Sequence, residues 1–393
     1  MEHSSLVTHP PAVAVPNDNR ALVAPIYQSV KFTFDDVVET KRQMNGERDG
    51  YWYSRKTNPT LRQLELTLAT VQGREGCLLT ASGAAAMNLT LLTLCEQGDH
   101  VLCFAEMYGP TRHMIRHVLG RYGVSHTMLS LDDVEGIERT LATVPTRVVV
   151  FESPSNPVLK IADIARITAA ARRRGALTVL DNTLAGVHNH ARFDIDVFVH
   201  SLTKYVSGHG DVLGGAVVAD NALIDRMRTD MAVLGATLDP HAAYLLQRGL
   251  KTYFLRCERQ CRNASVIAEH LVSRPEVSRL RYPGLAGHPQ NDLARAQQHD
   301  FGSMIVLDLC GGAEAARRFV ESLELFSIAA SLGSTESLVL PPQFLQPRDF
   351  DEEQHGWSGI TDATVRLSIG IEDVQDLLAD IEQALVASRA QSS

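Results

Sequence analysis

Residues 196–215 read DVFVHSLTKYVSGHGDVLGG and are the most informative part of the sequence. The first part of this stretch is a short apolar run with β-branched residues, which is typical of a buried strand. Glycine-rich sequence follows at once, so Lys204 is predicted just past a strand end rather than on a helix face. Ser201 and Thr203 flank this lysine and could bind phosphate oxygens. A pyridoxal phosphate (PLP) enzyme needs such an amine; a surface lysine in a loop is the other interpretation.

A second buried-strand pattern lies upstream and ends in an acid. Residues 176–183 read ALTVLDNT, with Asp181 at the predicted carboxyl end of the strand. In α/β proteins this end of a parallel strand faces the crevice where ligands bind. There Asp181 would pair with the pyridine nitrogen of PLP and keep it protonated, so that the ring can accept electrons. An acid after a strand can also be a helix cap or a turn residue, but the order and spacing of Asp181 and Lys204 favour the cofactor role.

These motifs resemble the PLP-dependent trans-sulfuration family. The resemblance is carried by residues 181–183 (DNT), 201–205 (SLTKY) and 208–211 (GHGD), and it extends from about Ala24 to Asp373. It implies an α/β protein of the PLP-dependent aminotransferase-like fold, fold type I. Such a protein has a large domain with a mainly parallel, seven-stranded-type sheet and a smaller α+β C-terminal domain.

The length of 393 residues allows two packed domains. We expect an N-terminal arm over residues 1–60 that contacts a neighbouring subunit, a large PLP-binding domain over 61–250 and a C-terminal domain over 251–393. Residues 1–19 lack a signal-peptide pattern, and no apolar run approaches transmembrane length, so we expect a cytoplasmic protein without a membrane partner. A net charge of −9 without a long basic run makes nucleic acid an unsuitable partner.

The six cysteines are scattered in apolar or helical contexts. Cys257 and Cys261 lie four residues apart on a predicted helix, but no second cysteine pair or histidine cluster accompanies them. We therefore predict buried free thiols and no metal site.

A candidate phosphate cradle precedes the second predicted helix. Thr60 is predicted to cap a first helix that ends near Gln72, and residues 81–87 (ASGAAAM) open the second. Free amides at a helix start bind anions without a charged side chain. Ser82, Gly83 and Ala84 are therefore candidate phosphate ligands, although Ser-Gly before a helix is also a common cap. The family usually has Met where Ala84 stands, and backbone contacts would survive that change.

The resemblance assigns further site residues. Tyr108, just past a predicted strand, would stack on the cofactor ring and move protons; the alternative is a buried core tyrosine. Asn156 would contact the cofactor ring oxygen and orient the substrate carboxylate. Ser331 would face the cofactor, and Arg366 would pair with the substrate α-carboxylate. The apolar, strand-like residues around Arg366 agree with that role, because burying an unpaired arginine is costly.

The arm ends in residues 51–60, which read YWYSRKTNPT. By resemblance, Tyr53 and Arg55 reach the cofactor phosphate of a neighbouring subunit, a role that suits the permanent charge and forked donors of arginine. The alternative is that these aromatic residues anchor the arm by burial. The resemblance implies a homotetramer built as a dimer of dimers, with each active site shared across a dimer.

The resemblance implies PLP-dependent elimination or replacement at Cγ of a sulfur- or ester-bearing L-amino acid, with Lys204 and Tyr108 as catalytic residues. We favour a cystathionine γ-lyase-like outcome that releases a 2-oxo acid and ammonia. A γ-synthase that joins an O-acylhomoserine-type substrate to a thiol or another nucleophile is the alternative. A catalytically silent PLP-fold binding protein is an alternative of another class. Pro110 and the apolar residues 231–233 depart from the pattern of methionine γ-lyases and stand against dedicated methionine lysis. Ala330 and residues 340–345 depart from other family patterns, so we expect an altered, less polar distal pocket that could suit a specialised substrate.

Overall fold

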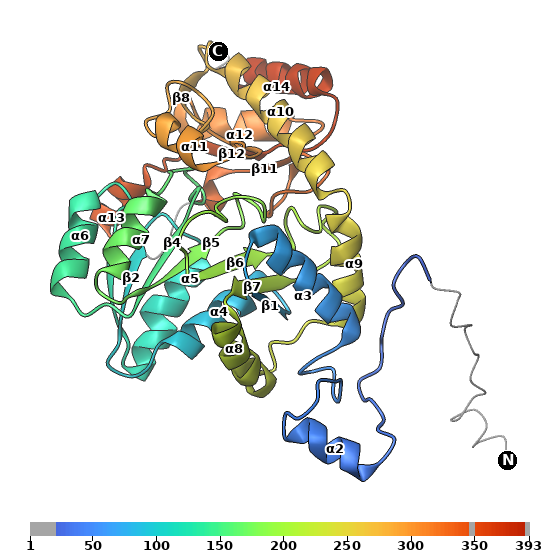
Figure 1. Ribbon diagram of the computed structural model, residues 1–393. Coiled ribbons are helices and arrows are strands. Elements are labelled where there is room, and N and C mark those ends of the chain that lie inside the picture. The colour runs from blue at the N-terminus through green and yellow to red at the C-terminus, as the bar shows by residue number, and fades with distance from the viewer. Residues whose placement is uncertain (1–20, 346–349, 390–393) are drawn as a thin grey trace.

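The computed structural model describes residues 21–345 and 350–389. Two layered units lie one above the other, each built around its own sheet, and an N-terminal arm extends from the lower one (Figure 1). The prediction about a signal peptide rests on residues 1–19, which lie outside the described residues. The boundaries predicted near residues 60 and 250 fall within α3 (Pro59–Gln72) and at the end of α9 (Pro240–Leu250), and they stay predictions.

The lower unit contains a seven-stranded sheet in the order β1-β7-β6-β5-β4-β2-β3. Neighbours from β6 to β3 are parallel, and β7 pairs antiparallel with both β1 and β6. The carboxyl ends of β2, β4, β5 and β6 therefore meet at one edge. The strands are β1 (Gly76–Thr80), β2 (His100–Phe104), β3 (Ser125–Leu129), β4 (Val148–Glu152), β5 (Leu177–Asp181), β6 (Val197–Ser201) and β7 (Gly215–Ala219).

Helices cover both faces of this sheet, which explains why central strands such as β4, with the sequence VVVFE, are buried throughout. Side chains of α3, α6, α7 and α9 pack in the core on one face, and those of α4, α8 and the π-helical turn η1 (Met114–Val118) pack on the other. This arrangement confirms the predicted α/β fold class with a mainly parallel sheet. The remaining helix bounds are α4 (Gly83–Leu94), α5 (Gly109–His113), α6 (Val134–Thr143), α7 (Ile164–Arg172) and α8 (Asn221–Leu234).

The start of α3 corrects one prediction. Asn58, not Thr60, caps the helix, because its side chain accepts a hydrogen bond from the Thr60 amide at 2.9 Å. Pro59 occupies the first helical position, where its missing N–H costs nothing, so the cap lies one residue before it. The Thr60 hydroxyl instead accepts a hydrogen bond from the Tyr27 amide at 2.9 Å and ties the arm to the body.

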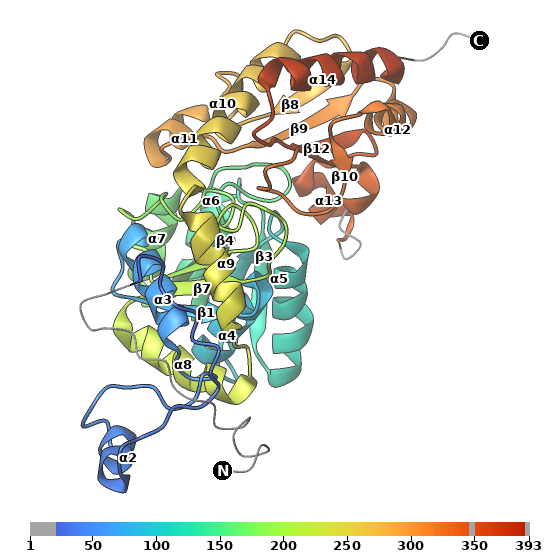
Figure 2. The same ribbon diagram turned by 90° about the vertical axis from the view of Figure 1, so that its right-hand side faces the viewer.

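The upper unit is built on a five-stranded sheet in the order β10-β11-β12-β9-β8. Its core lies between this sheet and α10, α12 and α14 (Figure 2). The strands are β8 (Val277–Arg281), β9 (Met304–Leu309), β10 (Ser327–Ile328), β11 (Leu338–Leu340) and β12 (Thr364–Ser368). The helices are α10 (Tyr253–Leu271), α11 (Asn291–Gln297), α12 (Gly312–Ser322), α13 (Glu352–Ser358) and α14 (Val374–Ser388).

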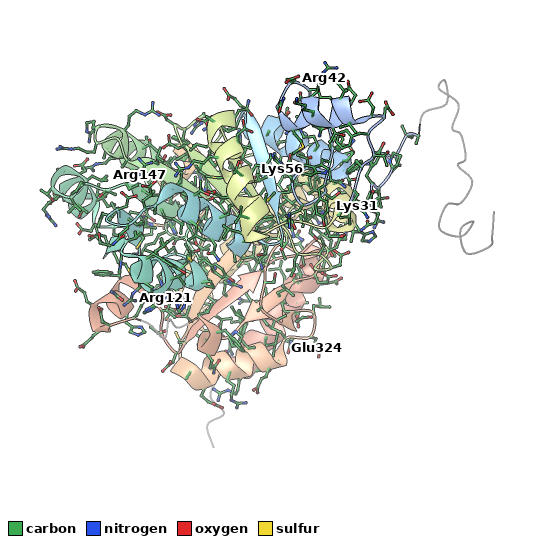
Figure 3. The ribbon with its side chains drawn as sticks, turned by 90° about the horizontal axis from the view of Figure 1, so that it is seen from below. Lys31, Arg42, Lys56, Arg121, Arg147 and Glu324 are labelled. Carbon is green, nitrogen blue, oxygen red and sulfur yellow. The ribbon has the colours of Figure 1, made fainter. Side chains whose placement is uncertain are left out.

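The described part of the arm contains α2 (Val37–Met44), a short helix that the sequence analysis does not predict and that has no buried residue. It projects away from both units (Figures 1 and 2). Trp52 is 53% exposed and Tyr53 is 39% exposed, so burial within the same chain does not anchor these aromatic residues. Lys31, Arg42 and Lys56 lie on the arm side of the molecule, away from Arg121 and Arg147 (Figure 3).

The cysteine prediction holds for most positions. Cys77, Cys95, Cys103 and Cys257 are buried free thiols, and Cys261 is partly buried. Cys310 is exposed because it lies just past the end of β9, so the prediction of burial is wrong there. None of the helices in the described ranges is both long and apolar enough to cross a membrane.

Gly249 in α9 provides a test of how the fold supports Lys204. A Cβ atom at this position would lie 2.4 Å from the Ser207 carbonyl oxygen and 2.6 Å from that of Val206, in the turn that follows Lys204. Gly249→Ala should lower the free energy of unfolding by about 1–3 kcal/mol, as overpacking does, although alanine favours helices. Urea unfolding measures this change.

Gly356→Ala is the matched control, because Gly356 is a glycine in α13 and, apart from the helix's own backbone, no atom of the described residues lies within 4 Å of an added Cβ. It should raise the free energy of unfolding by about 0.5–1 kcal/mol. If both variants gain stability, α9 does not pack as described against the turn after Lys204.

Candidate active site

The carboxyl-end edge of the seven-stranded sheet gathers most of the predicted site residues. Asp181 ends β5, Lys204 follows β6, and Tyr108 follows β2. The C-terminal unit contributes Arg366 from β12, and Ser331 from the segment between β10 and β11. The site therefore lies where the two units meet, and both units are needed to complete it.

Lys204 is held by both units. It lies three residues past β6, and its Nζ donates a hydrogen bond to the Ser331 hydroxyl at 2.7 Å. Burial, together with the positive charge of Arg366, lowers the pKa of Lys204 to about 8. A larger fraction of this amine is therefore neutral near physiological pH than for an ordinary lysine, which makes it a nucleophile and a base.

Asp181 lies beside a second buried acid, Glu152. The two residues are direct neighbours in the parallel pair β4–β5. Asp181 accepts hydrogen bonds from the Thr183 amide at 3.1 Å and hydroxyl at 2.6 Å. Burial raises the pKa of Asp181, and burial with the charge of Asp181 raises the pKa of Glu152 well above its usual range. A cation beside Asp181, such as a protonated ring nitrogen, would stabilise the ionised forms of both carboxyl groups.

Glu152 also organises the neighbouring backbone. Its two carboxylate oxygens accept hydrogen bonds from the amides of Tyr108 at 2.5 Å and Asn156 at 3.1 Å. No motif in the sequence singles out Glu152. An acid at the carboxyl end of the strand beside Asp181 is the signal that could have found it.

Arg366 is a buried cation with neutral partners. Its side chain donates to the Asn156 Oδ1 atom at 2.8 Å and to the Ser331 carbonyl oxygen at 2.9 Å. Its Nε has no hydrogen-bond partner among the described residues, and burial lowers the pKa of Arg366 to about 10. A carboxylate ligand would supply the missing negative charge through a bidentate contact.

Tyr108 is the partly exposed residue of the site. It occupies the residue before α5 and is 46% exposed, so it is not the buried core tyrosine of the alternative interpretation. Partial burial, with the negative charges of Asp181 and Glu152, raises the pKa of Tyr108. Its phenol therefore stays protonated at neutral pH and can stack on a flat ring and donate a proton.

The start of α4 packs against the end of β6. The Ser82 hydroxyl caps α4 by accepting a hydrogen bond from the Ala85 amide at 3.1 Å. A Cβ atom at Gly83 would lie 2.6 Å from the Cβ of Ser201, so only glycine allows this approach. The structure thus brings Ser82, Gly83, Ala84 and Ser201 together, at a helix end that favours anions.

Two groups of predicted residues make contacts within this chain. The Thr203 hydroxyl accepts a hydrogen bond from the Gly214 amide at 3.0 Å and donates one to the Gly214 carbonyl oxygen at 3.3 Å, just before β7. Tyr53 and Arg55 belong to the arm and contact each other, with the Arg55 guanidinium 5.3 Å from the Tyr53 ring centroid.

The donor set fits PLP. The start of α4 suits its phosphate, Asp181 suits a protonated ring nitrogen, and the amine of Lys204 suits its aldehyde. Arg366 is then available to bind a carboxylate of the substrate. These four functions require residues of four different elements, and the fold brings all of them to one edge.

Comparisons with known proteins agree with this chemistry. The family described as Cys/Met metabolism PLP-dependent enzyme matches residues 11–386. An L-methionine gamma-lyase of Pseudomonas putida is 45% identical over 372 residues, which cover 94% of this chain and 93% of the relative.

Solved structures give the same result. A cystathionine gamma synthase of Xanthomonas oryzae in complex with cystathionine has a TM-score of 0.88 at 36% identity, over 94% of each chain. A Campylobacter jejuni protein, with a TM-score of 0.87 at 32% identity over 93% of this chain and 96% of its own, carries N'-pyridoxyl-lysine-5'-monophosphate.

The lowered pKa of Lys204 can be tested by amine acylation at a series of pH values, read by peptide mass spectrometry on cofactor-free protein. Acylation of Lys204 should rise with pH and reach half its maximum near the lowered pKa of about 8. Arg366→Met should move this curve to higher pH, because a neighbouring positive charge is lost. An unchanged curve would show that Arg366 does not act on Lys204.

Lys160 is an internal control in the same digest. Burial alone would lower the pKa of Lys160, but Glu106 and Asp132 raise it above the ordinary value. Lys160 should therefore become reactive only at higher pH than Lys204, in both proteins.

Proposed function

Because this chain belongs to the Cys/Met metabolism family of PLP-dependent enzymes, we propose that its main reaction is γ-elimination from a sulfur-bearing L-amino acid. Its chemistry is elimination or replacement at Cγ with PLP as cofactor. In the proposed reaction a thiol leaves from Cγ, and a 2-oxo acid and ammonia are released. The alternative of a catalytically silent binding protein is not supported, since the relatives are enzymes.

The observation that carries the choice of elimination is the similarity to methionine gamma-lyases. The Pseudomonas putida enzyme is 45% identical, whereas the Xanthomonas oryzae synthase is 36% identical. Residues on the C-terminal side of the site agree with an apolar leaving group: Ala330 precedes Ser331, and residues 340–345 read LPPQFL. We therefore propose methionine or a related thioether amino acid as the substrate.

Several residues would hold the cofactor. Lys204 would bond to it covalently, Asp181 would face its ring nitrogen, and Tyr108 would stack on its ring. Asn156 would contact the ring oxygen. The phosphate would be bound by backbone amides and hydroxyls at the start of α4 and near the end of β6, from Ser82, Gly83, Ala84, Ser201 and Thr203. When bound, PLP supplies an electron sink for negative charge at the substrate carbons.

The residues of this chain would position the substrate and move its protons. Arg366 would bind the α-carboxylate, and Asn156 and the Ser331 carbonyl would keep its guanidinium in place. The Lys204 amine, with its lowered pKa, would remove the α-proton. The protonated phenol of Tyr108 would assist the departing thiol.

A γ-synthase is the second candidate, favoured by the close structural match to the Xanthomonas oryzae enzyme. Elimination and replacement share the same early proton transfers, so the cofactor residues do not separate them. The two outcomes differ in whether water or an added nucleophile completes the reaction.

Turnover of a substrate panel tests the proposed reaction. Purified protein should release 2-oxo acid and ammonia from methionine without an added thiol, and Lys204→Ala should be inactive because it lacks the covalent anchor. Cystathionine and an O-acylhomoserine, each with and without a thiol, complete the panel. If only the acylhomoserine with a thiol reacts and no 2-oxo acid appears, the synthase replaces our proposal.

We also propose a homotetramer, built as a dimer of dimers in which the arm of one subunit completes the site of its neighbour. In support, α2 has no buried residue, and Leu22, Val37 and Met44 are all more than half exposed. Exposed apolar surface of this kind is typical of a protein interface. Arg55 and Tyr53 would then contact the neighbour's cofactor phosphate. A cytoplasmic location stays a prediction.

Hybrid formation between two inactive variants tests the shared site. Lys204→Ala lacks the amine of its own site, and Arg55→Ala lacks the proposed contact to the neighbour's site. Co-expressed subunits should recover about a quarter of wild-type activity, because about half of the dimers are mixed and each mixed dimer has one complete site. If Arg55 served its own chain, no mixed dimer would have a complete site and activity would stay at the level of the single variants.

A further inference from the structure

We propose that Lys160 and Arg112 are positioning residues that clasp residues 350–358 of the C-terminal unit onto the turn that carries Tyr108. This inference rests on the catalytic role proposed for Tyr108. The turn comprises residues 105–108 between β2 and α5, and the clasped segment comprises Phe350 and α13. Each cation contacts both the turn and the segment.

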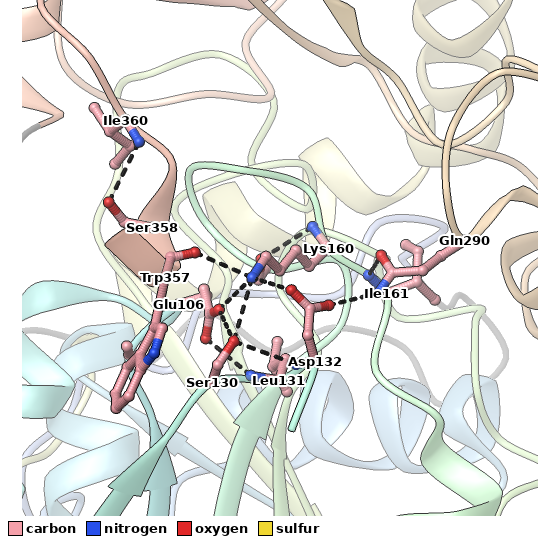
Figure 4. Close-up of polar contacts among 12 residues, drawn as sticks. Glu106, Ser130, Leu131, Asp132, Lys160, Ile161, Gln290, Trp357, Ser358 and Ile360 are labelled. Atoms are coloured by element: carbon pink, nitrogen blue, oxygen red, sulfur yellow. Dashed lines mark hydrogen bonds and ion pairs between the residues drawn. The ribbon is translucent and has the colours of Figure 1, made fainter. Parts of the chain in front are cut away.

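Lys160 forms the first contact (Figure 4). Its Nζ lies 2.5 Å from Glu106 Oε1, in the Tyr108 turn, and donates to the Trp357 carbonyl oxygen at 3.1 Å, in α13. It also pairs with Asp132 and lies 3.3 Å from the Ser130 hydroxyl. One ammonium group therefore joins a buried acid of the lower unit to the backbone of the upper unit.

Glu106 is fixed independently of the C-terminal unit. Its carboxylate accepts hydrogen bonds from the Ser130 hydroxyl at 2.7 Å and from the Leu131 amide at 3.1 Å. The residue is 2% exposed, so its charge requires the ammonium of Lys160. A shift of α13 would move the Trp357 carbonyl oxygen and, with it, the Lys160 ammonium that donates to it. Because the same ammonium pairs with Glu106, the shift would act on the turn.

Arg112 forms the second contact. Its guanidinium donates to the Ala105 carbonyl oxygen at 3.2 Å and to that of Met107, so it holds the turn on both sides of Glu106. The same guanidinium lies 4.4 Å from the centroid of the Phe350 ring. A cation over an aromatic face is an attractive contact, and here it crosses from the lower to the upper unit.

The two contacts converge on the placement of Tyr108. The Tyr108 amide donates to Glu152, the acid beside Asp181, so the turn links the clasp to the centre of the site. Loosening the clasp should misplace the phenol while leaving Lys204 and Arg366 in position. We therefore expect a loss of kcat with little change in KM, and retention of the cofactor.

Hydrogen exchange of the holoenzyme tests the structural part. Phe350→Ala removes the aromatic contact without disturbing the buried acid, and it should speed exchange of amides both in α13 and in residues 105–108. Tyr122→Ala is the matched control, because Tyr122 is an aromatic residue that is 63% exposed in the lower unit. Faster exchange in α13 alone would overturn the proposed coupling.

Kinetics test the functional part. Phe350→Ala and Lys160→Met should each lower kcat by roughly tenfold to a hundredfold, the effect of a small misplacement of a reacting group, with KM changed less than about threefold. Lys160→Arg keeps the charge and should recover part of the loss. A rise in KM alone, or no change in kcat, would contradict the proposal. If the wild type turned over none of the substrates, the proposed function would fail, and the exchange result would still decide the coupling.

Discussion

The site depends on one electrostatic constraint, which is that two cations and two acids, buried or partly buried, come together where the two units meet. The positive charge of Arg366 disfavours the charged form of Lys204, and the negative charge of Asp181 disfavours the charged form of Glu152. Burying such groups is costly, so the scaffold must hold them rigidly. The helices packed on both faces of the seven-stranded sheet provide that rigidity, while β12 adds Arg366 from the second unit. The result is a lysine that is partly neutral and a buried guanidinium suited to a carboxylate.

The sequence predicts the parts of the site that depend on strand ends. Asp181 and Lys204 follow recognisable buried strands, and the parallel arrangement then brings their side chains together. It does not predict Glu152, because only the pairing of β4 with β5 shows that this acid lies beside Asp181. It also places the cap of α3 at Thr60 instead of Asn58. The contacts of Lys160 and Arg112 join segments about 200 residues apart, and no local pattern contains that information.

The fold and the cofactor residues do not determine the reaction outcome. A lyase and a synthase both match nearly the whole chain, so the choice depends on a few side chains around the distal part of the substrate. We propose that those side chains come from the C-terminal unit and from the turn that carries Tyr108. On this account the placement of one unit on the other affects both substrate specificity and proton transfer. The contacts between the two units therefore matter for function.

The central claim is that Lys204 is the residue that bonds to PLP. Borohydride reduction of the purified enzyme, followed by proteolysis and mass spectrometry, tests it most directly. We predict one pyridoxyl phosphate label, located on the peptide that contains Lys204. A protein that carries no label after incubation with PLP, or a label on another lysine, would contradict the account.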